Sequence, residues 1–118
     1  MKRIAFIDLG SNSVRFVIYE ISKTGSYRLI YQEKNSVRLS ENMWGTQKLT
    51  NEAMERSLRS LKAFVHMAEA MEVDTIKAVA TAAVRLAKNG DIFIKTVKEQ
   101  TGLDLECIAG EEEARLGF

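Results

Sequence analysis

The stretch RIAFIDLGSNS, at residues 3–13, decides how the fold begins. Residues 3–9 are mostly apolar and favour extended structure, which predicts a buried strand. The polar cluster that follows, from Gly10 to Ser13, is typical of a turn. The stretch therefore predicts a strand that ends in a tight polar turn.

Two more strands follow this turn. Residues 14–21 alternate, with Val14 and Phe16 on one face and Arg15 on the other, which is the pattern of a strand. After a second turn that contains a glycine, residues 27–37 continue in extended form. The chain is therefore expected to open as a three-stranded meander.

A long amphipathic helix is expected after a polar connection at residues 38–50. Thr50 is the expected N-cap, and the helix is expected to end near Met71. The apolar residues between these points recur in steps of four, three, four and three, which is the spacing of one helix face. They are Met54, Leu58, Leu61, Val65 and Ala68.

Strands and helices then alternate to the end of the chain. We expect strands at 74–81 and 103–108, a short helical segment at 82–87, a second helix at 92–100, and a third helix that begins at Glu111. Asn89 lies where a break and a helix cap are expected. Gly102 lies where a helix commonly ends on a left-handed glycine.

These elements give the order βββαβαβα and predict a mixed α/β fold with a five-stranded sheet. The 118 residues are expected to form a single domain, because a chain of this length buries roughly 65% of its unfolded surface. No internal repeat and no proline-rich linker divides the sequence.

The charge and composition exclude several classes of protein. Seventeen Lys and Arg against sixteen Asp and Glu leave a net charge of +1, which does not predict a nucleic-acid-binding surface. Apolar runs stay well short of the roughly 18 residues that cross a membrane. Cys107 is the only cysteine, so an intramolecular disulfide cannot form, and a reducing cytoplasmic location is expected.

The turn after the first strand is the first candidate for chemistry. Gly10 lets the backbone approach a ligand, and turn N–H groups together with the side chains of Ser11, Asn12 and Ser13 can bind phosphate oxygens. Asp8, at the end of the strand, can hold a cation or its water shell. The alternative interpretation is a simple hairpin turn stabilised by its own polar side chains.

Two further segments carry charged groups that suit a phosphate site. Arg85 follows the predicted fourth strand, where ligands of α/β sheets gather, and it can form a forked contact with phosphate or lie on the surface as a helix-capping residue. The segment 111–113 contains three glutamates, of which one or two can face a common site. They can serve a water-activating role or form an ordinary acidic helix start.

Two residues that often carry chemistry receive structural interpretations. His66 follows a core position of the long helix and is expected at the surface. Cys107 lies in an apolar strand and is expected to be a small buried hydrophobic residue.

Taken together, these segments resemble the exopolyphosphatase/guanosine pentaphosphate phosphatase family. The resemblance covers essentially the whole chain and rests on five blocks: residues 8–13 (DLGSNS), 37–39 (VRL), 80–89 (ATAAVRLAKN), 101–103 (TGL) and 110–116 (GEEEARL). It implies a ribonuclease-H-like lobe of the actin, sugar-kinase and heat-shock ATPase superfamily. In that family two such lobes flank a cleft in which Mg²⁺ and polyphosphate or guanosine pentaphosphate bind.

The resemblance also implies roles for individual residues. A terminal phosphoanhydride would be hydrolysed, with Glu113 as the catalytic residue that positions or activates the attacking water. Asp8 would lie near Mg²⁺, bound through water. The phosphate chain would be contacted by Gly10, Ser11, Asn12, Ser13 and Arg85.

The chain also departs from the family pattern. Ala82, Leu86 and Gly117 replace residues that are common in the family, and its second phosphate motif, Asp-x-Gly-Gly-Gly-Ser, is absent. We therefore expect the chain to be the N-terminal lobe only, inactive by itself, with an uncovered face that promotes self-association. A phosphate-binding module without catalysis, or a lobe of a sugar or acetate kinase, is the alternative.

Overall fold

The order of strands and helices in the computed structural model agrees with the order expected from the sequence. The structure describes residues 1–41, 43 and 45–108. Within these residues the elements are β1 (Lys2–Leu9), β2 (Ser13–Ile21), β3 (Tyr27–Ser36), α1 (Asn51–Ala70), β4 (Thr75–Thr81), α2 (Ala82–Leu86), α3 (Gly90–Thr101) and β5 (Leu105–Ile108). The expected third helix, at Glu111, lies outside the described residues.

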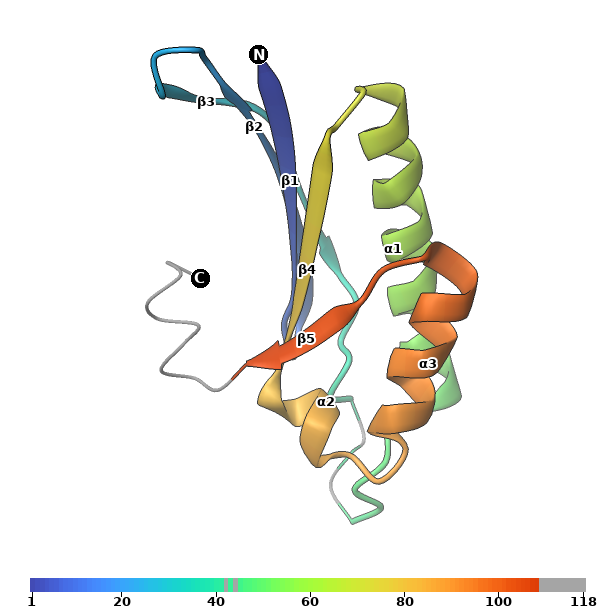
Figure 1. Ribbon diagram of the computed structural model, residues 1–118. Coiled ribbons are helices and arrows are strands. Elements are labelled where there is room, and N and C mark those ends of the chain that lie inside the picture. The colour runs from blue at the N-terminus through green and yellow to red at the C-terminus, as the bar shows by residue number, and fades with distance from the viewer. Residues whose placement is uncertain (42, 44, 109–118) are drawn as a thin grey trace.

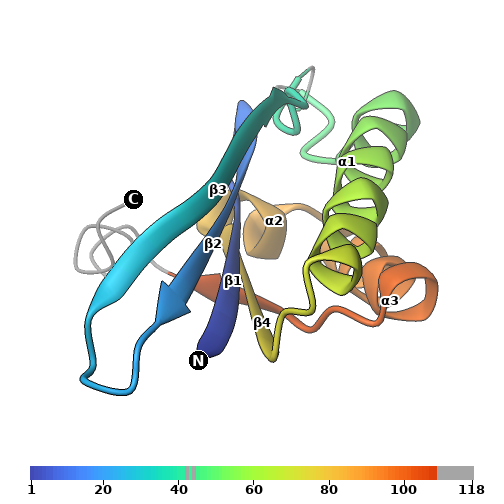
Figure 2. The same ribbon diagram turned by 90° about the horizontal axis from the view of Figure 1, so that it is seen from above.

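The five strands form one mixed sheet in the order β3-β2-β1-β4-β5. β1, β2 and β3 pair as an antiparallel meander, whereas β1–β4 and β4–β5 are parallel pairs. Figure 1 shows α1 and α3 on the same side of this sheet, and the view from above in Figure 2 agrees. α2 lies at the end of β4.

The main core lies between the sheet and α1. Phe16 of β2 stacks on Phe64 of α1 with ring centroids 4.7 Å apart and an angle of 12° between the rings. Ile7 and Leu61 are fully buried nearby, each with 0% of its surface exposed. The alternation that predicted Val14 and Phe16 on the inner face of β2 is confirmed, because inward residues of a strand repeat every second position.

The buried face of α1 differs from the predicted one. Thr50 caps the helix as predicted, because its hydroxyl accepts a hydrogen bond from Ala53 N at 3.1 Å. The buried residues are Ala53, Ser57, Leu61, Phe64 and Ala68, while Met54, Leu58 and Val65 are only half-buried. The buried face is therefore rotated, because the small residues Ala53 and Ser57 let the helix approach the sheet closely.

Two boundaries also differ from prediction. α3 begins at Gly90, and the Asn89 side chain does not cap it. β5 begins at Leu105, two residues later than expected, after a turn in which Leu103 N donates to Thr101 Oγ1 at 3.1 Å. Gly102 ends α3 in a left-handed conformation at φ 79°, as predicted. Within the described part of the chain, every helix is too short or too polar to cross a bilayer.

Candidate phosphate-binding site

The structure brings the first two predicted segments to one edge of the sheet. β1, β4 and β5 are parallel, so their carboxyl ends lie together. Leu9 pairs with Ala80, and Thr81 pairs with Ile108. A Cβ placed on Gly10 would lie 3.9 Å from Thr81 Cγ2, which shows that the turn after β1 contacts the end of β4. Ligands of open α/β sheets gather at such an edge.

Gly10 lies in the turn between β1 and β2 because the backbone there reverses tightly. Its N–H donates to Ser13 O at 2.8 Å, and an added Cβ would lie only 3.2 Å from the same oxygen. Since this N–H is used within the turn, Gly10 provides close approach rather than a free donor. The segment from Gly10 to Ser13 is called the phosphate loop below.

The carbonyl groups of Ser11 and Asn12 in the phosphate loop are bound by the segment that follows β3. Asn12 O accepts hydrogen bonds from Val37 N at 2.9 Å and Arg38 N at 2.8 Å, and Ser11 O accepts one from Ser40 N at 3.1 Å. Apart from the Gly10 N–H, the backbone hydrogen bonds described for the turn thus use its carbonyls. The N–H groups of Ser11 and Asn12 are left for an anion, which is the arrangement that a concave phosphate site needs.

Asp8 and Arg15 lie opposite each other on the sheet face that points away from α1 and α3. They are cross-strand partners in the β1–β2 ladder, and Arg15 is also paired with Lys34 of β3. Asp8 is half-buried, whereas Arg15 is exposed. A shallow groove of about 360 Å³ is lined by Arg15, Gln32, Glu33 and Lys34. Arg15 is not among the site residues predicted from the sequence, although its spacing of two from Ser13 places both on one strand face.

Arg85 lies on α2, directly after β4, and its side chain is exposed. Arg85 is close to Cys107 of β5, because its charge and its backbone N–H both lower the pKa of the Cys107 thiol. Burial raises this pKa by more, so the pKa of the thiol lies above its ordinary value. Arg85 is therefore at the same edge of the sheet as the phosphate loop. Cys107 is only half-buried, so the expectation of a buried position is wrong.

The remaining predicted residues have different outcomes. His66 is exposed on α1, as expected. Glu113, with the neighbouring glutamates, lies outside the described residues, so its predicted catalytic role stays a prediction.

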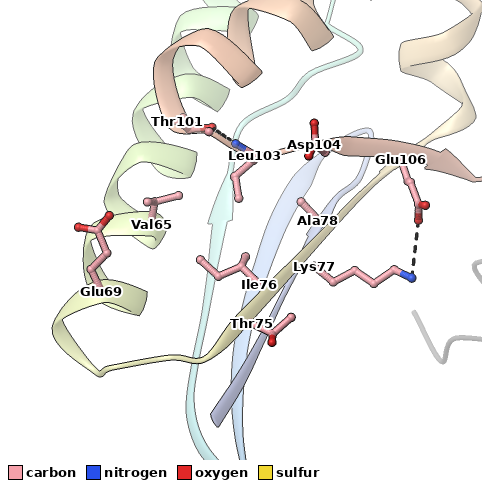
Figure 3. Close-up of a pocket in the computed structure, with 11 residues that line it drawn as sticks. Val65, Glu69, Thr75, Ile76, Lys77, Ala78, Thr101, Leu103, Asp104 and Glu106 are labelled. Atoms are coloured by element: carbon pink, nitrogen blue, oxygen red, sulfur yellow. Dashed lines mark hydrogen bonds and ion pairs between the residues drawn. The ribbon is translucent and has the colours of Figure 1, made fainter. Parts of the chain in front are cut away.

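A second and larger groove lies at the opposite end of the parallel strands (Figure 3). Its volume is about 580 Å³, and it is lined by parts of α1, β4, the turn after α3 and β5. Three carboxylates line it, and Lys77 is already 3.7 Å from Glu106. Thr75 begins the groove, six residues and about 20 Å of strand before Thr81. Because this groove is acidic and remote from the phosphate loop, it does not suit a phosphate chain.

The described residues 1–41, 43 and 45–108 contain no cluster of three His, Cys, Asp or Glu side chains that could hold a metal by themselves. Asp8 is the carboxylate nearest the phosphate loop in sequence. Mg²⁺ commonly binds through one or two carboxylates, several waters and the phosphates of a substrate. A single half-buried carboxylate beside a phosphate loop fits a metal held in that way.

Comparison with known proteins shows which proteins this chain resembles. The guanosine-5′-triphosphate,3′-diphosphate pyrophosphatase of Pseudoalteromonas atlantica is 45% identical over 113 residues, which cover 94% of this chain and 22% of that protein. The crystal structure of the Aquifex aeolicus Ppx/GppA phosphatase superposes with a TM-score of 0.93 at 34% identity. It matches 98% of this chain and 38% of the Aquifex chain.

An exopolyphosphatase from Cytophaga hutchinsonii gives a TM-score of 0.90 at 32% identity, over 98% of this chain and 36% of that one. These matches confirm the expected ribonuclease-H-like lobe fold. The chain spans about a fifth of the curated relative and somewhat over a third of the solved structures. The sequence profile of the Ppx/GppA phosphatase family matches residues 17–118, and the chain belongs to that family.

Proposed function

We propose that this chain is the phosphate-binding lobe of a Mg²⁺-dependent hydrolase that releases the terminal phosphate of polyphosphate or guanosine pentaphosphate. The observation that carries the proposal is the orientation of the phosphate loop. The carbonyls of Ser11 and Asn12 accept hydrogen bonds from the segment 37–40, which leaves the N–H groups of Ser11 and Asn12 for an anion at the carboxyl edge of the sheet. For the chain alone we propose binding, and for the whole protein hydrolysis.

The residues of the loop suit the charge that develops in phosphoryl transfer. This reaction needs positioning and charge neutralisation more than covalent chemistry. Ser11, Asn12 and Ser13 would donate hydrogen bonds to the oxygens of the phosphate that is released. Arg85 and Arg15 would bring positive charge from α2 and from β2.

Mg²⁺ would be held near Asp8 through water and would neutralise phosphate oxygens when bound. Asp8 would orient this water shell with its carboxylate oxygens. Glu113 would accept the proton of the attacking water, because a carboxylate placed within hydrogen-bonding distance can act as a general base. The water oxygen would bond to the terminal phosphorus as the bond from that phosphorus to its bridging oxygen breaks, so that inorganic phosphate and a phosphate chain shortened by one unit are the products.

Both proposed substrates share the chemistry that the site would recognise. The names of the relatives include a guanosine-5′-triphosphate,3′-diphosphate pyrophosphatase and an exopolyphosphatase. Polyphosphate and guanosine pentaphosphate are both polyanions that end in a phosphoanhydride. A cytoplasmic location is part of the same proposal and rests on the single cysteine, Cys107.

The proposal is tested by phosphate release from long-chain polyphosphate and from guanosine pentaphosphate, with and without MgCl₂, in the whole protein that contains this chain. Glu113→Gln is expected to lower kcat by about 10²–10⁴-fold, the range for loss of a general base. Glu99→Gln, an exposed glutamate on α3, serves as the matched control and is expected to match wild type.

Two outcomes would overturn the proposal. A wild-type kcat in Glu113→Gln would show that Glu113 is not the general base. Transfer of phosphate to a sugar or to acetate, with a nucleotide as donor, would favour the kinase alternative. Metal-independent release would contradict only the Mg²⁺ assignment and would leave the hydrolase in place.

A further inference from the structure

We propose that Arg56 of α1 is a positioning residue that fixes the shape of the phosphate loop without touching the substrate. This inference rests on the proposed function of that loop. The Arg56 side chain is only 19% exposed and reaches from the helix to the segment that follows β3. Its effect on the loop follows from a continuous chain of hydrogen bonds.

The guanidinium of Arg56 makes three contacts with one short segment. Nε donates to Val37 O at 2.9 Å, Nη2 donates to Arg38 O at 3.3 Å, and the same Nη2 donates to Glu41 Oε2 at 2.7 Å. The planar fork of arginine can bind several acceptors in a fixed geometry, which a lysine cannot reproduce. Arg56 therefore fixes the segment 37–41 relative to α1.

That segment in turn holds the phosphate loop. The Val37 carbonyl and the Arg38 N–H belong to the same peptide group. Arg56 binds the oxygen of this group, while its N–H donates to Asn12 O at 2.8 Å. Such a chain of bonds is mutually strengthening, because each polarises the next peptide. The orientation of the Asn12 carbonyl also fixes the Ser13 N–H, which belongs to the same peptide group.

The backbone of Arg38 explains why the segment needs support. Its φ is 47°, in the left-handed region that side chains other than glycine seldom adopt. Arg56 binds the carbonyls of Val37 and Arg38, which belong to the peptide groups on either side of the Arg38 Cα. The buried side chains of Val37 and Leu39, exposed by 1% and 0%, anchor the same segment in the core. Arg56 thus stabilises a strained turn whose function is to present two N–H groups to Asn12.

Kinetics of the whole protein test this assignment. Arg56→Met is expected to lower kcat/KM for phosphate release by about tenfold or more, because small misplacements of a site cost large factors in rate. Arg56→Lys is expected to recover only part of this loss. Arg59→Met, which removes an exposed arginine three residues away, is expected to leave kcat/KM unchanged.

A stability-matched variant separates positioning from folding. Val97→Ala weakens the core at α3, away from the loop, and is expected to lower Tm while keeping kcat/KM within twofold of wild type at a temperature well below Tm. Addition of guanidinium chloride at low millimolar concentration to Arg56→Ala is expected to restore part of the activity. Retention of wild-type kcat/KM by Arg56→Met, or an equal loss in Val97→Ala, would overturn the inference.

Hydrogen exchange in the 118-residue chain gives a readout that does not depend on activity. In Arg56→Met, the amides of Val37 and Arg38 are expected to exchange about tenfold faster or more, while the amides of α3 keep their rates. Unchanged exchange at Val37 and Arg38 would overturn the positioning role. If the wild-type protein releases no phosphate but this exchange result holds, the proposed function fails and the structural coupling stands.

Discussion

The side chain of Asn89 forms two hydrogen bonds with the backbone of Leu49, forty residues earlier in the chain. Leu49 N donates to Asn89 Oδ1 at 2.8 Å, and Asn89 Nδ2 donates to Leu49 O at 3.0 Å. The Asn89 amide thus binds both backbone polar groups of one residue, as a neighbouring strand would. The contact ties the start of α3 to the connection before α1, next to α2 and Arg85.

Asn89→Ala is expected to lower the free energy of unfolding by about 1–3 kcal/mol, because it leaves a donor and an acceptor of Leu49 without their partners. Asn89→Asp keeps the acceptor but loses the donor, so an intermediate loss is expected. Urea denaturation measures both, with Gln100→Ala, an exposed amide side chain on α3, as the control. A loss in Asn89→Ala no larger than in Gln100→Ala would contradict the role of this pair.

Replacement of Gly90 by alanine is predicted to destabilise the protein for a different reason from replacement of Gly25. A Cβ on Gly90 would overlap the carbonyl group of Val84, whereas one on Gly25 meets nothing within 4 Å. Gly90→Ala is therefore expected to cost roughly 1–3 kcal/mol of stability through overpacking. Gly25→Ala is expected to cost about 1 kcal/mol, from its φ of 87° alone. Thermal unfolding compares the two variants, and Gly90→Ala is expected to have the lower Tm. A lower Tm in Gly25→Ala would show that α2 can move away from α3.

Glu20 gives the protein a predictable response to acid. Burial alone would raise the pKa of this carboxyl group, but hydrogen bonds and positive charge from Arg3 and Arg28 outweigh burial and hold the pKa below its ordinary value of 4.5. The contacts are 3.2 Å from Arg3 Nε and 2.8 Å from Arg28 Nη2. The unfolded state therefore binds a proton at higher pH than the folded state.

The sign of the effect follows from linkage. The stabilisation from Glu20 is fully present above the unfolded pKa and is lost as the pH falls through the lower folded pKa. Glu20→Gln is expected to have a lower Tm than wild type at pH 7, and the difference is expected to shrink below a pH of about 4. Measurement of Tm from pH 7 to below pH 4 tests this expectation, with Glu55→Gln, a substitution of an exposed glutamate, as the control. A Tm difference that is constant with pH would show that the charge of Glu20 is not what stabilises the fold.

Self-association of the chain stays a prediction, and the structure indicates where to test it. β3 is an edge strand, and Tyr27 and Leu29 on it are 71% and 44% exposed. Apolar edge strands favour pairing with a second chain. Light scattering is expected to show a mass above that of the monomer at high concentration, and Leu29→Lys is expected to lower it. A monomer at every concentration would contradict the prediction.

Local patterns in the sequence were sufficient to predict most of the fold. The alternation in β2, the N-cap at Thr50 and the left-handed glycine at position 102 are each determined by a few neighbouring residues, and the structure confirms them. The rotated face of α1 could not be predicted from periodicity, because Ala53 and Ser57 are buried by the closeness of the sheet rather than by their own hydrophobicity.

The sequence could predict candidate site residues together only where they are neighbours in the chain. The phosphate loop is contiguous, so its residues could be identified together. Arg56 and Asn89 bind backbone groups that are 19 and 40 positions away, those of Val37 and Leu49, and Arg15 is the cross-strand partner of Asp8, 7 positions away. Nothing in the sequence around these residues indicates such partners, because side-chain contacts with a distant backbone depend on the assembled sheet.

The central claim is that the phosphate loop binds phosphate, and amide NMR of this chain tests it most directly. Titration with tripolyphosphate and MgCl₂ is predicted to shift the amide signals of Ser11, Asn12 and Ser13, and this shift is predicted to be lost in Ser11→Val. The contrary result is a response confined to the groove at the other end of the strands, around Thr75 and Asp104, or no response at concentrations that saturate other phosphate loops. Either would show that the turn after β1 is a structural hairpin.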